Sequence, residues 1–146
     1  MTYRVIVTGS REFTDEKIID DALYNLWHDN IGYQSTDKLV IIQGGAAGAD
    51  KLAREIAANN TDTALLENYP ADWEHCDINC DPDHRRVRLG DVTYCPKAGY
   101  RRNKQMLDSG ADVVLAFYKT GAANKGTQMM VDLAEAAGIP VRKYYE

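Results

Sequence analysis

Short apolar segments alternate with stretches of helical spacing along the whole chain. The apolar segments cover residues 4–8, 39–43, 64–69, 112–117 and 140–144. The run LVIIQ at 39–43 is almost uninterrupted, which is typical of a parallel strand covered on both faces. We therefore expect about five strands, of which the one at 64–69 is the weakest and is ended by Pro70.

Between these strands, apolar residues recur at the three- and four-residue spacing of amphipathic helices. The helical stretches cover residues 15–30, 50–59, 100–109 and about 126–137. Gly110 and Gly138 follow the last two, as glycines often do where a helix ends. This alternation predicts an α/β fold, a Rossmann-like doubly wound parallel sheet of about five strands. Ligands of such sheets bind beyond the carboxyl ends of the strands.

The composition fits one globular domain over residues 1–146, with 45% hydrophobic and 27% charged residues. No stretch approaches the ~20 apolar residues of a membrane span, and the short apolar run near Met1 does not resemble a secretory signal. We therefore expect a cytoplasmic protein with no membrane partner. The net charge of -5 argues against a general surface for duplex DNA, so nucleic acid is a disfavoured partner.

Three of the predicted strand-to-helix junctions carry small residues. They are Gly9-Ser10-Arg11, the segment from Gly44 to Asp50, and Gly126-Thr127. Because such junctions share one edge of a parallel sheet, the glycines would let backbone N–H groups and helix N-termini approach a phosphate there. Ser10 and Thr127 add hydroxyl donors, and Arg11 adds a planar guanidinium.

The segment Gly44-Gly45-Ala46-Ala47-Gly48-Ala49-Asp50 is the most informative of the three, because its three glycines directly follow a strand. It is neither a Walker phosphate loop nor a Gly-x-Gly-x-x-Gly dinucleotide fingerprint. Tight turns alone would also explain the glycines, but their combination favours ligand binding. Asp50 fits two compatible roles, as the N-cap of the following helix or as a contact to the ligand.

Five pieces of the sequence are distinctive when taken together. They are Val-Thr-Gly-Ser-Arg at 7–11, Gly-Gly-Ala-Ala-Gly-Ala-Asp at 44–50, Tyr-Pro-Ala-Asp-Trp at 69–73, Ala-Gly-Tyr-Arg-Arg-Asn at 98–103 and Lys-Gly-Thr-Gln at 125–128. The set resembles the SLOG superfamily, and more narrowly its small YspA/YpsA-related branch, often found in phage and bacterial genomes. The superfamily includes the LOG phosphoribohydrolases and the DprA DNA-processing proteins. The resemblance covers the chain except for an insertion at about 74–97.

This resemblance implies a Rossmann-like domain that binds a nucleotide or nucleotide-derived ligand at its glycine loops. It also implies that Arg102 and Asn103 face the pocket. From the residues alone, an Arg-Asn pair at a helix start serves equally well as a cap with a solvated charge. We favour a clamp on the ligand.

One departure separates this chain from the LOG enzymes, which carry a glutamate soon after their Gly-Thr segment. Here Gln128, Met129 and Met130 follow Gly126-Thr127. Cleavage of a glycosidic bond uses carboxylates to protonate the leaving group or to stabilise an oxocarbenium-like state. Asp50 and Asp132 are the candidate replacements for the missing glutamate, and Asp132 is expected on a helix surface. The sequence therefore favours binding over catalysis.

All three cysteines and two of the three histidines fall between residues 75 and 95. Cys76, Cys80, His84 and Cys95 form a Cys₃His set of the kind that holds structural zinc, with His75 in reserve. The segment lacks an apolar pattern of its own, so a metal would supply the missing stability. The alternatives are a disulfide, which a cytoplasmic location disfavours, and unrelated buried cysteines. We expect an inserted zinc-binding loop.

The leading hypothesis is a binder of a nucleotide-derived small molecule, acting as a sensor or a sequestering protein, with a structural zinc loop. One alternative is a nucleotide or nucleoside-phosphate N-glycosidic hydrolase of LOG type. Another is a DprA-like binder of single-stranded nucleic acid, which the acidic balance weakens. Tyr144 and Tyr145, expected to be exposed, favour a homodimer.

Overall fold

The computed structural model describes residues 3–76, 86–87 and 93–146. Within them, five parallel strands form a central sheet in the order β3-β2-β1-β6-β7. The strands are β1 (Tyr3–Gly9), β2 (Leu39–Gln43), β3 (Ala64–Asn68), β6 (Val113–Tyr118) and β7 (Val141–Tyr145). The predicted α/β, Rossmann-like parallel sheet is confirmed.

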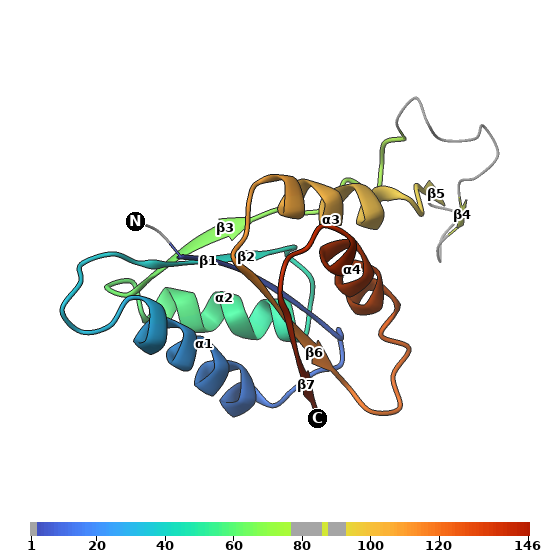
Figure 1. The fold of residues 1–146 in the computed structure, drawn as a ribbon. Helices are drawn as coiled ribbons and strands as arrows, with labels where there is room; N and C mark the ends of the chain where they lie inside the picture. Colours follow the sequence, from blue (N-terminus) through green and yellow to red (C-terminus); the bar gives the residue numbers. More distant parts are fainter. Residues whose placement is uncertain (1–2, 77–85, 88–92) are drawn as a thin grey trace.

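Helices cover both faces of this sheet (Figure 1). They are α1 (Glu16–Asn30), α2 (Ala49–Asn59), α3 (Ala98–Asp108) and α4 (Lys125–Ala136). Successive side chains of a strand point to opposite faces, so Val5 packs in the cluster with α1 and α2, and Ile6 packs in the cluster with α3 and α4. Both faces are therefore apolar, as the LVIIQ run indicated.

The order of the strands reverses beside β1. The chain runs outward from β1 through β2 to β3, and then crosses back to β6, which pairs with the other side of β1. The connections from β1 and β6 therefore diverge onto opposite faces and leave room between the carboxyl ends of these strands. This is the point at which open α/β sheets bind ligands.

The tyrosines at the end of β7 differ from expectation in one respect. Tyr144 is partly buried and its ring stacks on Phe117 with centroids 5.1 Å apart, because the register of β7 places it beside that ring. The expectation that Tyr144 is exposed is therefore wrong. Tyr145 is 63% exposed, although it stacks on Tyr118.

The insertion is described only at its ends and in one short pair of strands. Here β4 (Arg86–Val87) pairs antiparallel with β5 (Thr93–Tyr94). Among the described helices, none combines the length and the apolar character that crossing a membrane requires.

Candidate functional site

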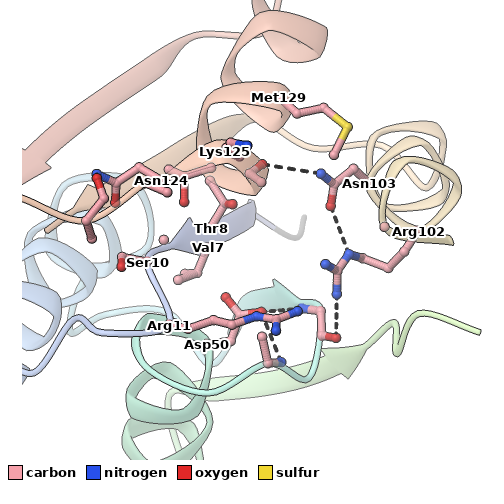
Figure 2. A pocket seen from close by; sticks show the side chains of 18 of the residues that line it. Val7, Thr8, Ser10, Arg11, Asp50, Arg102, Asn103, Asn124, Lys125 and Met129 are labelled. Carbon is pink, nitrogen blue, oxygen red and sulfur yellow. Dashed lines mark hydrogen bonds between the residues drawn. The ribbon is translucent and has the colours of Figure 1, made fainter. Parts of the chain in front are cut away.

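A pocket of about 420 Å³ lies at the carboxyl edge of the sheet, where the strand order reverses (Figure 2). Its volume is in the range of small-molecule sites. The end of β1, the loops after β1 and β2, helix α3 and the start of α4 all contribute to its wall. The lining residues are Val7, Thr8, Gly9, Ser10, Arg11, Glu12, Gly44, Ala46, Asp50, Trp73, Pro96, Gly99, Arg102, Asn103, Met106, Ala122, Ala123, Asn124, Lys125, Gly126, Thr127 and Met129.

Most of the residues predicted to bind the ligand line this one pocket. They are Gly9, Ser10, Arg11, Gly44, Asp50, Arg102, Asn103, Gly126 and Thr127. Gly45, Gly48 and Ala49 do not line it. The structure thus brings three separate junctions together, as expected from a parallel sheet, while their contact with a ligand stays a prediction.

Gly48 and Ala49 hold the loop after β1 against α2. The backbone of Gly48 has φ 71°, and a Cβ there would collide with the Ser10 carbonyl oxygen and the Arg11 backbone. Ala49 donates its backbone N–H to the Ser10 carbonyl oxygen at 3.2 Å. The need for glycine at position 48 is therefore explained by close packing of two loops rather than by a ligand.

The backbone N–H groups of the Gly44–Ala46 loop already have partners within the protein. Asp50 Oδ2 accepts from the N–H of Gly44 at 3.1 Å and from that of Ala46 at 3.3 Å. The Gly45 N–H donates to Gln43 Oε1 at 2.6 Å. Side chains of this segment therefore satisfy these N–H groups in the ligand-free structure, and their contact with a phosphate stays a prediction.

Asp50 is consequently not the N-cap of α2. Gly48 occupies that position, and Asp50 lies within the first turn with its carboxylate turned back to the loop. Burial, which leaves 5% of the residue exposed, raises the pKa of this carboxyl, while hydrogen bonds from Ala46 and Gly44 and the charges of Arg102 and Arg54 oppose the shift. In the described part of the chain Oδ1 has no hydrogen-bond partner, and it is not among the fully enclosed polar atoms, so it opens onto the pocket.

Arg102 and Asn103 connect three sides of the pocket (Figure 2). Arg102 Nη1 donates to the Gly44 carbonyl oxygen at 2.6 Å, and its Nε donates to Asn103 Oδ1 at 2.8 Å. Asn103 Nδ2 in turn donates to the Gly126 carbonyl oxygen at 3.5 Å. Arg102 and Asn103 therefore do not cap α3, which was the alternative interpretation of this pair. Both residues lie beyond the first turn of α3 and bind neighbouring loops.

The N-terminus of α4 forms the opposite side of the pocket. The Asn124 side chain binds the backbone of Lys119 and Ala122 instead of capping the helix, so no side chain caps α4. The positive end of the helix dipole therefore meets the pocket at Lys125 and Gly126. Thr127 is only 3% exposed, and in the described residues its hydroxyl has no partner although it lines the cavity.

Ser10 shapes the loop after β1. Its N–H donates to the Phe117 carbonyl oxygen at 2.9 Å, and its Oγ accepts from the Glu12 N–H at 3.1 Å. Among the described residues, no acceptor is recorded for the hydroxyl hydrogen of Ser10. Arg11, the next residue, is exposed and also lines the pocket (Figure 2).

Sequence reasoning missed several lining residues, among them Trp73, Pro96, Lys125 and Met129. Trp73 belongs to the distinctive piece at 69–73, which was a usable signal, but nothing in its local pattern indicated a pocket. Asp132, the other candidate carboxylate, is exposed and accepts a hydrogen bond from Gln128 at 2.8 Å, so it lies on the surface as expected.

The predicted zinc ligands are only partly described. Cys76 is exposed and Cys95 is buried, while Cys80 and His84 lie outside the described residues. Within the described residues, no three His, Cys, Asp or Glu side chains gather as a metal would require. The zinc loop therefore stays a prediction. Arg101 ties the two ends of the insertion together, since it donates to Cys95 Sγ at 3.4 Å and to the His75 carbonyl oxygen at 2.6 Å.

Comparison with known proteins places the chain in a family. It is 34% identical over 141 residues to the Gene 61 protein of Mycobacterium phage D29, covering 94% of this chain and 93% of that protein. Among solved structures it is similar to DNA processing protein A (DprA) from Streptococcus pneumoniae, with a TM-score of 0.48 and 14% identity. That match covers 98% of this chain, which spans 59% of the DprA chain. Residues 3–75 match the model of the YspA, cpYpsA-related SLOG family, and the chain therefore belongs to this family.

Proposed function

We propose that the pocket binds a nucleotide or nucleotide-derived ligand, in a sensor or sequestering role. The observation that carries this proposal is the meeting of positive groups with an uncapped helix N-terminus in one cavity. Arg11, Arg102 and Lys125 line the same space as the first turn of α4. Helix N-termini and guanidinium groups are the protein groups that most often hold phosphates.

The polar atoms suggest how such a ligand would lie. A phosphate fits the α4 end, where Thr127 supplies a hydroxyl and Gly126 allows close approach. The Oδ1 atom of Asp50 suits a sugar hydroxyl, because a carboxyl group accepts hydrogen bonds from hydroxyls and a carboxylate repels phosphate. The ligand would thus extend from α4 toward the loop after β2.

Equilibrium binding to a panel of nucleotides, measured by titration calorimetry, tests the proposal. We expect saturable binding, weakened about tenfold or more by Thr127→Val, which removes one hydroxyl to a charged group at nearly constant volume. Lys104→Met is the matched control, because Lys104 is exposed on α3 and does not line the pocket. Absence of saturable binding across the panel would overturn the proposal.

A second candidate function is N-glycosidic hydrolysis of the bound nucleotide. The observation in its favour is the Asp50 carboxyl, which lines the pocket and whose pKa is raised by burial, as befits a general acid. Chromatography of the incubated nucleotide would then show a released base and a ribose phosphate. Asp50→Asn would abolish release, whereas release by this variant at the rate of the unaltered protein would exclude Asp50 as the acid. If the unaltered protein binds the nucleotide saturably but releases no base, hydrolysis is excluded and binding is the remaining function.

For the insertion the proposal is a structural zinc site built from Cys76, Cys80, His84 and Cys95. The Cys₃His composition supports it. Four protein ligands leave no open position, so the metal would stabilise the loop and would not take part in chemistry. The backbone N–H of Cys95 donates to the Trp73 carbonyl oxygen at 2.6 Å, which links this end of the insertion to a pocket residue.

A further inference from the structure

We propose that Trp73 is the stacking platform for the base of the ligand, so that the pocket selects nucleotides over sugar phosphates. This inference rests on the proposed function and specifies its ligand class. Trp73 lines the pocket, although it is far in sequence from the glycine loops and belongs to the flank of the insertion.

The indole of Trp73 is held from two sides. Its six-membered ring leans on Gly99 of α3, where a Cβ would stand 3.2 Å from the indole Cη2. The Tyr94 ring packs against it edge to face, with centroids 6.0 Å apart. The backbone of Trp73 is also fixed by the bond from Cys95. A ring held in this way loses little conformational entropy when a ligand stacks on it.

Part of the remaining cavity wall is apolar and suits a flat group. Pro96, Met106 and Met129 line the same cavity and offer no charged atoms. Among the groups that suit a phosphate, Arg11 belongs to the loop after β1, and Lys125 and Thr127 belong to the first turn of α4. A molecule with one charged end and one planar aromatic end matches both chemistries, and a nucleoside phosphate is such a molecule.

The contacts along α3 indicate which end of the ligand lies at which end of the pocket. Gly99 and Arg102 are three residues apart and therefore share one face of the helix. The indole lies on Gly99, the guanidinium binds the Gly44 carbonyl oxygen, and Asn103 links that guanidinium to Gly126. The wall thus runs from Trp73 through Arg102 to the N-terminus of α4. A base on Trp73 leaves the phosphate directed to α4.

A two-by-two comparison tests the inference. The ligands are a nucleoside 5′-monophosphate, taken in turn as AMP, GMP, CMP and UMP, and ribose 5-phosphate, which lacks the base. The proteins are the unaltered chain and Trp73→Ala, with affinities measured by calorimetry. We expect Trp73→Ala to lower the affinity for the nucleotide that binds best by about 5- to 100-fold. The affinity for ribose 5-phosphate should change by no more than about twofold. Trp73→Phe should retain most of the affinity that Trp73→Ala loses.

The outcomes separate the two proposals. Equal losses for both ligands would show that the indole only supports the pocket wall, and no loss for either would show that no base stacks there. Both results overturn the inference and leave the proposed function standing. If neither ligand class binds the unaltered chain, the proposed function itself fails and the inference falls with it.

A second measurement avoids dependence on the folding of Trp73→Ala. The chain has two tryptophans, so Trp27→Phe leaves Trp73 as the sole indole reporter. Trp27 lies on α1 and does not line the pocket. We expect the fluorescence of this variant to be quenched saturably by the nucleotide and to be unaffected by ribose 5-phosphate. Unchanged emission during calorimetrically proven nucleotide binding would contradict stacking.

Discussion

Arg102 donates from Nη1 to the carbonyl oxygen of Gly44 across 2.6 Å, and this bond joins α3 to the loop after β2. The two residues are 58 positions apart in sequence. Through Asn103 the same guanidinium is connected to Gly126 at the start of α4. One side chain therefore positions the loops of the pocket and also presents positive charge to it.

Replacing Arg102 with methionine should weaken nucleotide binding by about 10- to 100-fold. The substitution keeps most of the apolar stem but removes the charge and the bonds to Gly44 and Asn103, and hydrogen bonds of charged groups contribute about 1.5–3 kcal/mol each. Calorimetric titration measures the effect, with Lys104→Met as the exposed control on the same helix. Equal affinities for the two variants would contradict a role of Arg102 in the pocket. Arg102→Lys should recover only part of the lost affinity, because an ammonium cannot replace the planar guanidinium.

Asp50→Asn should change how stability depends on pH. Burial raises the pKa of the Asp50 carboxyl, so the folded chain holds this proton more tightly than the unfolded chain does. The stability linked to this group is complete below the unfolded pKa of about 3.9 and is lost as pH rises through the folded pKa. The amide of the variant keeps an oxygen for the Gly44 and Ala46 N–H groups but does not titrate.

Urea unfolding measures this difference directly. We expect the free energy of unfolding of Asp50→Asn, relative to the unaltered chain, to increase as pH rises from about 4 toward neutrality. Comparing the two proteins at each pH cancels the contributions of the other carboxyls. A relative stability that decreased with pH over this window would mean that the pKa of Asp50 is lowered rather than raised.

Glu67→Gln should show the opposite dependence on pH. Arg4 donates to both carboxylate oxygens of Glu67 at 2.7 Å and joins β1 to β3 across the intervening strand. The hydrogen bonds from Arg4 lower the pKa of Glu67, so its contribution is present above the unfolded pKa of about 4.3 and is lost as pH falls through the folded pKa.

We expect Glu67→Gln to lower the free energy of unfolding by about 1 kcal/mol at neutral pH, because the pair is partly exposed, and by progressively less in acid. The exposed Lys17–Asp21 pair on α1 serves as the control, and Asp21→Asn should have no measurable effect. A loss for Glu67→Gln that persisted undiminished in acid would indicate a packing defect instead of a lost ion pair.

Gly48→Ala should destabilise the protein more than Gly110→Ala. Both glycines have positive φ, 71° and 90°, so both substitutions pay about 1–2 kcal/mol for a left-handed backbone. Only at Gly48 would the new Cβ also collide with backbone, whereas at Gly110 no atom lies within 4 Å. We expect a total cost of about 2–5 kcal/mol at Gly48, measured by thermal or urea unfolding. Equal costs would refute the close packing of the loop after β1 on α2.

Metal analysis should find about one zinc per chain in protein purified without added metal. The expected ligands are Cys76, Cys80, His84 and Cys95, and removing the metal with a chelator should lower thermal stability because metal binding stabilises the loop. Cys80→Ser should lose most of the zinc. Full metal content and unchanged stability in this variant would contradict the assignment, and Ser35→Ala, outside the insertion, controls for the handling of the protein.

Local patterns predicted where the strands and helices lie along the chain. They did not predict which side chains of distant elements pack together. The expected strand at 112–117 is Val113–Tyr118, and the expected helix at 50–59 is Ala49–Asn59, so their boundaries moved by one residue. The helix expected at 100–109 begins two residues earlier, at Ala98. Tyr144 was misjudged because its burial depends on Phe117, which only the pairing of β6 with β7 brings beside it. No local pattern carries that information.

The meeting of three glycine-bearing junctions at one edge was readable from the chain, because apolar runs and helical spacing establish the alternation that makes the sheet parallel. The contacts that each residue makes there depend on the folded arrangement of distant segments. This arrangement turned Asp50 toward its own loop and placed Arg102 against Gly44 and Trp73 against Gly99. Periodicity is a property of neighbours in the chain, while hydrogen bonds and ring contacts depend on which distant segments the sheet brings within a few ångströms of each other.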